Sequence, residues 1–288
     1  MTVPAQVFPD LSAEQQERLR YRRGQARRSR VLAGGSTVAF LAVFGTVIVL
    51  SPGWPRVRDQ FFDLQVARES LPSIAEGFWL NLRILVVCAL LILVVGLGVA
   101  GLRTLRGPVF APVRFLAAAY TDVFRGMPLI VLLYLVGFGI PGLRLQGVPN
   151  GPAVLGSVAL VLTYSAYVAE VFRAGIETVH PSQRMAARSL GLTYGQSMRR
   201  VVLPQAVRRV TPPLLNDLVA LQKDVGLISV LGAVDAVRAA QIEVARTYDF
   251  TPYLVAGLLF IALAVPTVRL ADWVTSRATR RQQAAGIA

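Results

Sequence analysis

The chain has 288 residues, of which 54% are hydrophobic and only 16% are charged, and its mean hydropathy is +0.55. This composition excludes an ordinary soluble protein and is typical of a helical membrane protein. The formal net charge of +14 comes from 29 arginines and a single lysine. A nucleic-acid-binding protein is disfavoured, because the basic residues lie between long apolar runs and not on one folded face.

The first 50 residues consist of a polar part and an apolar part. Residues 1–30 are rich in arginine, and residues 31–50 carry no charge. Twenty apolar residues are enough to cross a bilayer core of about 30 Å. We expect an uncleaved first transmembrane helix, because the leader is too long, and the apolar run too extended, for a signal peptide.

Five more apolar segments follow, and together with the first they predict an all-α integral membrane protein with six transmembrane helices. Gly126 and Pro128 interrupt the second of these five segments. Residues 56–76 are mixed in charge and are expected to form an amphipathic or irregular connection, and residues 232–249 a polar connection. The only cysteine, Cys88, lies within an apolar segment and is expected to be a small buried hydrophobe. The five segments are 78–102, 115–140, 153–172, 207–231 and 251–270.

The distribution of basic residues predicts the orientation of these helices. If the N-terminus is cytoplasmic, the four inside segments carry 20 basic residues and the three outside segments carry 6. The bias has the same direction throughout, as the positive-inside rule requires. We therefore expect a multi-pass protein of a plasma membrane with both termini in the cytoplasm.

The predicted cytoplasmic stretch 180–204 contains four arginines and no acid. Pro181 is suited to the first position of a helix, and Gly191 to the left-handed turn that ends one. Thr193 and Gln196 have the spacing of a capping box, so a second short helix is expected to begin there and to stop near Pro204. Such a stretch could bind to another protein, or it could lie on anionic lipid headgroups as a basic amphipathic loop.

Ionisable residues within apolar segments are costly at membrane depth and are candidates for a translocation path or gate. Asp122 and Arg125 are three residues apart and could simply pair, as could Glu170 and Arg173. Lys223, the only lysine, is adjacent to Asp224 and cannot easily satisfy it. The six candidates for a substrate path or gate are Asp122, Arg125, Glu170, Asn216, Lys223 and Asp224.

A set of motifs in a fixed order resembles the permease subunits of bacterial ABC importers. The pattern Ala186-Ala187, Gly191 and Val201-Val202-Leu203-Pro204 is similar to the cytoplasmic EAA loop of that family. The match extends to 167–175 before the loop and to Asn216 and Lys223-Asp224 after it. The stretch 124–129 and the dipeptide Asn81-Leu82 are similar to the branch that imports polar amino acids. The resemblance covers residues 73–273, and residues 1–50 lie outside the shared core of five helices.

This resemblance implies a type I importer fold and a mechanical role. The domain at 73–273 would contain a coupling loop at 173–206, a leader at 1–30 and an extra helix at 31–50 would precede it, and a cytoplasmic tail at 274–288 would follow. The expected partners are a cytoplasmic ABC ATPase dimer, an extracytoplasmic solute-binding protein, a second permease chain and membrane lipid, without nucleic acid. ATP would bind to the ATPase, and this chain would hold no cofactor or metal. The residues expected to couple to the ATPase are Ser182, Gln183, Met185, Ala186, Ala187, Leu190, Gly191, Leu203 and Pro204.

One position departs from the family pattern, because Met185 stands where the loop usually has an acid. Docking is therefore expected to depend on shape and on the basic residues of the loop. Two other functions are considered. A secondary transporter or channel would use the intramembrane charges directly but would not need the loop. A membrane-embedded enzyme is disfavoured because the sequence has no P-loop, no nucleophile–base set and a single histidine.

Overall fold

The computed structural model describes residues 13–105 and 107–284, so part of the Arg-rich leader and the end of the tail lie outside the described residues. The chain divides into two compact units, of which one ends at Asp59 and the other begins at Gln60. In the first unit, α1 (Ala13–Val49) is a single helix, and its apolar part from Arg28 to Val49 is long enough to span a membrane. The short helix α2 (Trp54–Phe61) crosses the boundary between the units.

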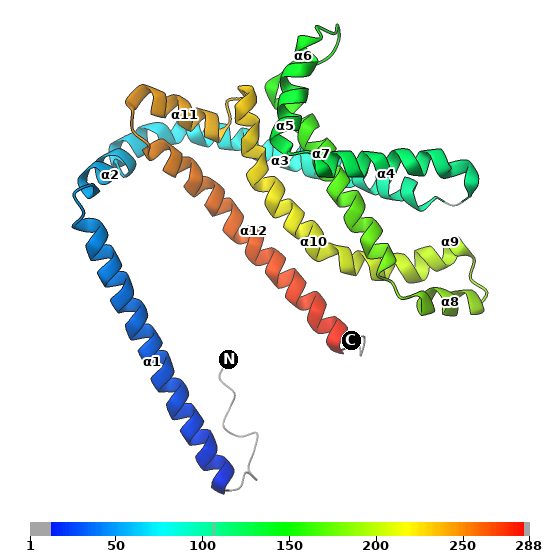
Figure 1. Ribbon diagram of the computed structural model, residues 1–288, viewed down its shortest axis with the longest axis horizontal. Coiled ribbons are helices and arrows are strands. Elements are labelled where there is room, and N and C mark those ends of the chain that lie inside the picture. The colour runs from blue at the N-terminus through cyan, green and yellow to red at the C-terminus, as the bar shows by residue number, and fades with distance from the viewer. Residues whose placement is uncertain (1–12, 106, 285–288) are drawn as a thin grey trace. The chain divides into compact units, whose positions relative to one another are not determined.

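The second unit is a bundle of helices, shown in Figure 1. Its long helices carry the apolar segments, and its short ones lie at the two ends of the bundle. The helices are α3 (Leu64–Thr104), α4 (Ala111–Gly126), α5 (Leu129–Tyr134), α6 (Ile140–Gly142), α7 (Pro152–Glu177), α8 (Pro181–Ser189), α9 (Tyr194–Ser197), α10 (Leu203–Asp224), α11 (Ala236–Thr247) and α12 (Thr251–Ala284). Short 3₁₀ segments cover Pro108–Phe110 and Val225–Leu231, and π-helical turns cover Leu135–Gly139 and Met198–Val202.

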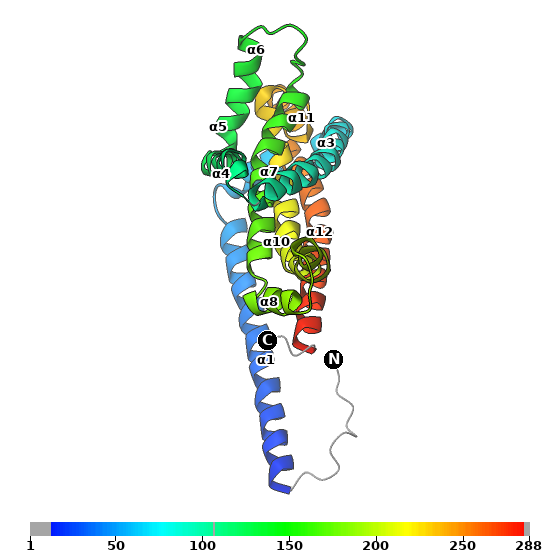
Figure 2. The same ribbon diagram turned by 90° about the vertical axis from the view of Figure 1, so that its right-hand side faces the viewer.

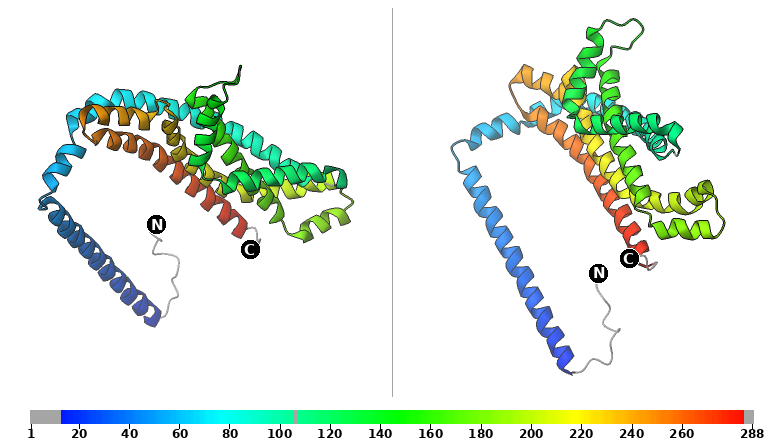
Figure 3. Two further views of the ribbon diagram at one scale, coloured as in Figure 1. Left: turned by 45° about the horizontal axis from the view of Figure 1, so that its top comes forward. Right: turned by 45° about the vertical axis from the view of Figure 1, so that its right-hand side comes forward.

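Helix α7 is at the centre of the bundle and packs against α3, α4, α5 and α10. Its N-terminal end leads from α6 and its C-terminal end leads to α8, so these two short helices lie at opposite ends of the unit (Figure 2). Helices α10 and α12 run side by side (Figure 3). The main apolar core lies between α3, α7, α10 and the 3₁₀ segment that follows α10, and it contains Cys88, Leu160 and Ile228, each with none of its surface exposed.

A buried amide on α3 joins that helix to α11. The Asn81 side chain donates to the Asp235 carboxylate at 3.0 Å and accepts from the backbone N–H of Ala236 at 3.0 Å. Asp235 also caps α11 by accepting from the backbone N–H of Arg238. One turn away, Gly77 lets the two segments touch, because a Cβ atom there would lie 2.4 Å from the carbonyl carbon of Asp235.

Four helices are long and apolar enough to span a membrane, and up to six spans result if each of two bent helix pairs counts as one. The first bent pair has an angle of 105° at the break after Gly126, where the sequence predicted an interruption. At 56–76, where the sequence predicted an amphipathic or irregular connection, and at 232–249, where it predicted a polar one, the structure has α2, the start of α3 and α11. Aspartates cap both helices: Asp63 accepts from two backbone N–H groups at the start of α3, and Asp235 accepts from one at the start of α11.

Candidate functional site

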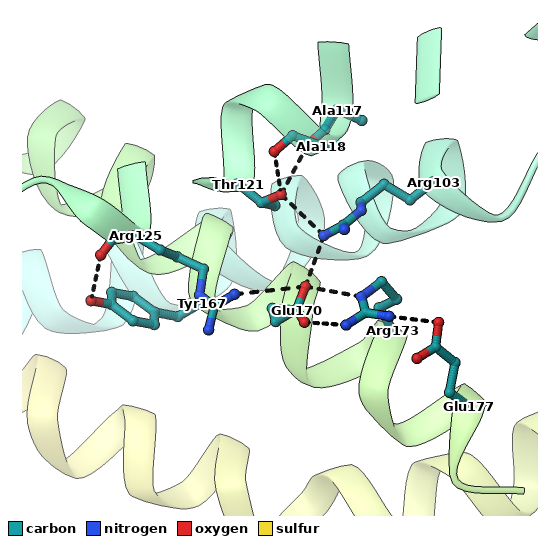
Figure 4. A network of polar contacts seen from close by, with 9 residues as sticks. All are labelled: Arg103, Ala117, Ala118, Thr121, Arg125, Tyr167, Glu170, Arg173 and Glu177. Carbon is teal, nitrogen blue, oxygen red and sulfur yellow. Dashed lines mark hydrogen bonds and ion pairs between the residues drawn. The ribbon is translucent and has the colours of Figure 1, made fainter. Parts of the chain in front are cut away.

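A cluster of charged residues surrounds Glu170 on α7 (Figure 4). The Glu170 carboxylate pairs with Arg103 from the end of α3 at 2.8 Å and with Arg173 one turn along α7. Arg173 also pairs with Glu177 at 2.6 Å. Arg103 donates a further hydrogen bond to the hydroxyl of Thr121 on α4 at 3.0 Å. One carboxylate therefore joins three helices, and the prediction that Glu170 and Arg173 pair is confirmed.

Arg125 is the cation of this cluster that is held most weakly. Its guanidinium lies 3.7 Å from Glu170, beyond hydrogen-bonding distance, and its side chain is 39% exposed. The guanidinium also lies 5.8 Å from the centre of the Tyr167 ring, within range of a cation–π contact. The expected alternative, a pair between Arg125 and Asp122, does not form, because α4 turns Arg125 toward α7 while Asp122 is exposed.

Arg125 lines a cavity of about 450 Å³ at the break between α4 and α5. Pro128 cannot donate a backbone hydrogen bond, so the chain kinks here, and residues 126–129 line the cavity. Residues from α7 and α10 also line it. Those with polar atoms are Thr163, Tyr164, Tyr167, Asp217 and Asp224.

Two carboxylates from α10 face this cavity. The Tyr164 hydroxyl donates to Asp224 at 2.7 Å. By contrast, Oδ2 of Asp217 is buried and has no hydrogen-bond partner within the described residues, and the same holds for the hydroxyl of Thr163. The sequence analysis did not select Asp217. A signal for Asp217 was present in the sequence: it lies seven residues before Asp224, and residues seven apart share one face of a helix.

The other path candidates occupy different positions. Asp122, Asn216 and Lys223 are exposed in this chain and do not line the cavity. Glu170 does not line the cavity, but its carboxylate lies 3.7 Å from the guanidinium of Arg125, which does. Of the six predicted path residues, the structure thus brings Arg125 and Asp224 to one cavity and places Glu170 in contact with Arg125.

The stretch at 180–204 forms the two predicted short helices. His180 caps α8, with its Nδ1 atom accepting from the backbone N–H of Ser182, and Gly191 has the left-handed φ of +76°. Thr193 and Gln196 form the expected capping box. The prediction that the second helix stops near Pro204 is wrong. A π-helical turn at Met198–Val202 widens the helix before the proline, and the chain continues directly into α10.

Most of the predicted coupling residues form an exposed surface at this end of the bundle. Ala187 is the exception, since it is buried against the chain itself. Two arginines fix the loop to the end of α7. Arg184 donates to the carbonyl of Ile176 at 2.5 Å, and Arg209 donates to the carbonyl of Thr178. The exposed coupling residues are Ser182, Gln183, Met185, Ala186, Leu190, Gly191, Leu203 and Pro204.

Apolar helices around a polar cavity at a helix break define a multi-pass membrane protein of the transporter class. The chain belongs to the family of binding-protein-dependent transport system inner membrane components, which matches residues 109–280. Members of this family are transport permeases and not catalytic enzymes.

Solved structures and curated proteins agree with this assignment. The structure described as an amino acid ABC transporter with histidines is 31% identical, with a TM-score of 0.69, over 75% of this chain and 98% of that chain. The arginine transport system permease protein ArtQ of Bacillus subtilis is 36% identical over 70% of this chain and 91% of its own length. The probable glutamine ABC transporter permease protein GlnM of the same organism is 36% identical over 66% and 86%. The predicted fold class, a helical type I importer permease, is confirmed.

Proposed function

We propose that this chain is the transmembrane permease subunit of an ATP-driven importer that carries a polar amino acid into the cytoplasm from an extracytoplasmic binding protein. The similar permeases are described as transporting arginine or glutamine. The observation that carries the proposal here is the polar cavity at the helix break. It presents a guanidinium from α4 and two carboxylates from α10 within one space of about 450 Å³.

In this proposal Arg125 binds the α-carboxylate of the substrate. Glu170 already pairs with Arg103 and Arg173, so it does not need Arg125 as a partner. The guanidinium of Arg125 therefore keeps its donors for a second carboxylate and can bind one bidentately. Asp224, which lines the same cavity from α10, supplies an acceptor for the substrate ammonium group.

A pair of arginine substitutions tests this path. We expect Arg125→Gln to lower amino acid uptake by about tenfold or more, because one charge-assisted contact is lost. Arg144→Gln is the matched control, since Arg144 is exposed in the loop before α7 and lines no part of the cavity. Equal uptake by the two variants in proteoliposomes containing the complete importer would contradict the path.

We also propose that α8 and its left-handed turn dock on a cytoplasmic ATPase. The exposed side chains at this surface include Met185, which is 61% exposed, and Leu190, which is 82% exposed. Exposed apolar side chains on a short helix rimmed by arginines are suited to a groove of another protein. Because Met185 is apolar, contact at this point would depend on packing and not on an ion pair.

The single buried cysteine makes this docking directly testable. Cys88 has none of its surface exposed, so Met185→Cys introduces one accessible thiol into a chain whose own thiol is protected. We expect a short bifunctional reagent to cross-link this thiol to the co-expressed ATPase, and the parent chain to give no product. Cross-linking at Asp272→Cys on α12, but not at Met185→Cys, would refute the assignment of this surface.

The remaining partners follow from the same proposal. One chain has one coupling loop, so an ATPase dimer with two docking clefts requires a second permease, either a copy of this chain or a related one. The chain would span a bacterial plasma membrane with both termini on the cytoplasmic side, in keeping with the arginine bias of the loops. Labelling of engineered cysteines in the loops of intact cells would check this orientation.

A further inference from the structure

Helix α1 is longer than a membrane span requires. It runs without interruption from Ala13 to Val49, so the charged residues before Val31 and the apolar residues after it belong to one helix (Figure 1). The apolar part is about 30 Å long, which matches the thickness of the bilayer core. The charged part adds about 27 Å of helix at a rise of about 1.5 Å per residue. If the apolar part spans the bilayer, the charged part projects out of it.

The projecting part of α1 is strongly basic and has no apolar face. Seven arginines and no acid lie between Arg18 and Arg30. Only Leu19, Tyr21 and Ala26 are apolar or aromatic there, which is too few for a face that could insert into a membrane surface. Arginine and glutamine favour a helix, and the transmembrane part supplies the helix nucleus, so this part can continue into solvent without packing. It is therefore suited to stand away from the membrane and not to lie on it.

The arginines of α1 divide into two groups by their distance from the bilayer. Arg27, Arg28 and Arg30 lie within about 6 Å of the start of the apolar part, inside a headgroup layer of about 5–8 Å. The four distal arginines lie about 12–20 Å from that point, and even a helix tilt of about 40° leaves about 9–15 Å. Salt screens charges over about 8 Å, so lipid headgroups attract the distal arginines only weakly. The four distal arginines are Arg18, Arg20, Arg22 and Arg23.

The stretch that carries the proposed docking surface indicates what the distal arginines bind. Six arginines and no acid lie between His180 and Arg209. Arg184 and Arg209 donate to carbonyl groups of this chain, and the other four arginines have no acid partner among the described residues. A protein that docks there needs an acidic rim, because like charges across an interface are unfavourable. The same acidic surface would attract the distal arginines, which the arginine bias places on the same side of the membrane.

We infer that the distal arginines of α1 form a second contact with the cytoplasmic ATPase, through acidic residues on the surface of that protein. This contact raises both the affinity of the ATPase for the permease and its rate of association. Helix α1 lies outside residues 109–280, which match the permease family, so the contact is an addition to the coupling loop. The inference rests on the proposed function and orientation, since these supply the ATPase and place it on the side of the arginines.

Replacement of all four distal arginines by glutamine tests the contact, because glutamine removes the charge and still favours a helix. Binding of the ATPase is measured on the full chain in nanodiscs of phosphatidylcholine, which has no net charge. We expect the affinity to fall about tenfold at low salt, as several exposed ion pairs together provide, and to fall less at physiological salt. Unchanged affinity would overturn the inference. The substitutions are Arg18→Gln, Arg20→Gln, Arg22→Gln and Arg23→Gln.

A matched control removes the same number of charges elsewhere. It replaces four exposed arginines in segments that the orientation places outside the cell, and its affinity for the ATPase should stay within about twofold of the parent chain. An equal fall in affinity in this control would show that only the net charge matters and would overturn the inference. The control substitutions are Arg56→Gln, Arg58→Gln, Arg144→Gln and Arg246→Gln.

Cross-linking locates the contact without the loss of any arginine. Because Cys88 is buried, Leu19→Cys and Ser29→Cys each add one thiol to a chain whose own thiol is protected. We expect a short bifunctional reagent to join the ATPase to Leu19→Cys, in the distal part, and not to Ser29→Cys, in the headgroup layer. A product with Ser29→Cys alone would place the contact at the membrane surface and overturn the inference.

Other partners of the distal arginines give different results. A loss of ATPase affinity that occurs only in nanodiscs with anionic phosphatidylglycerol would assign the distal arginines to lipid and overturn the inference. Binding of a DNA duplex that depends on these arginines, with unchanged ATPase affinity, would overturn it in favour of nucleic acid. Unchanged ATPase affinity together with ATP-dependent uptake would leave the proposed importer function intact. A parent chain that binds no ATPase would refute both.

Discussion

Loss of the Glu170 charge should destabilise the bundle more than loss of any other surface or cavity acid. In Glu170→Gln, Arg103 keeps only its hydrogen bond to Thr121, and Arg173 keeps Glu177. Arg125 loses the one acid within 4 Å of it among the described residues. Three cations would then face a neutral amide at the junction of α3, α4 and α7.

The magnitude follows from the exposure of the partners. Removing one member of a buried ion pair costs about 3–5 kcal/mol. The side chains of Arg103 and Glu170 are 16% and 19% exposed, so the lower end of that range applies. About 3 kcal/mol corresponds to a fall in Tm of about 6–12 °C for a unit of this size.

Thermal unfolding of the purified chain in detergent measures this effect. Glu177→Gln is the matched control, because Glu177 is 61% exposed and such pairs contribute about 0–1 kcal/mol. A second substitution, Arg103→Gln in the Glu170→Gln background, should recover part of the loss by removing one unpaired cation. If Glu170→Gln unfolds within about 2 °C of the parent chain, the cluster does not join the three helices and the reasoning fails.

Two glycine pairs provide further predictions. Gly77→Ala should destabilise the chain by about 1–3 kcal/mol, because its Cβ would lie 2.4 Å from the carbonyl carbon of Asp235. Gly98→Ala in the same helix is the control. Its Cβ meets nothing within 4 Å, so this variant should be neutral or stabilising. Unfolding curves of the two variants that coincide would show that α3 and α11 do not touch at Gly77. Gly191→Ala should cost about 1–2 kcal/mol at φ +76° and lower transport-coupled ATPase activity, with Gly195→Ala as its control. ATPase activity that stays coupled in Gly191→Ala would mean that the left-handed turn is not needed for docking.

Local signals in the sequence were sufficient for the long apolar helices and for the caps and turn of the loop between α7 and α10. The left-handed turn favours glycine at position 191, and the capping box of Thr193 begins α9. Both features depend only on nearby residues and could be predicted. The end of α9 could not be predicted in the same way. Pro204 stops a regular helix, but a π-helical turn five residues long lets the chain continue into α10.

The site depended on contacts that are distant in the sequence. By spacing, Asp122 was the expected partner for Arg125. The structure places Arg125 near Glu170 because α4 packs against α7 on that side. Asp217 was missed because its spacing from Asp224 places the two on one face of α10 but does not show that this face lines a cavity with the break at Pro128. Such pairings are set by the packing of whole helices and not by local spacing.

The central claim is that ATP hydrolysis by a partner drives amino acid movement through this chain. The most direct measurement is uptake of labelled amino acid by proteoliposomes that contain the chain, its ATPase and its binding protein. We predict uptake only when ATP is present on the ATPase side, and no loss of uptake when ionophores collapse the ion gradients. Uptake that needs an ion gradient and proceeds without ATP would contradict the account and favour a secondary transporter.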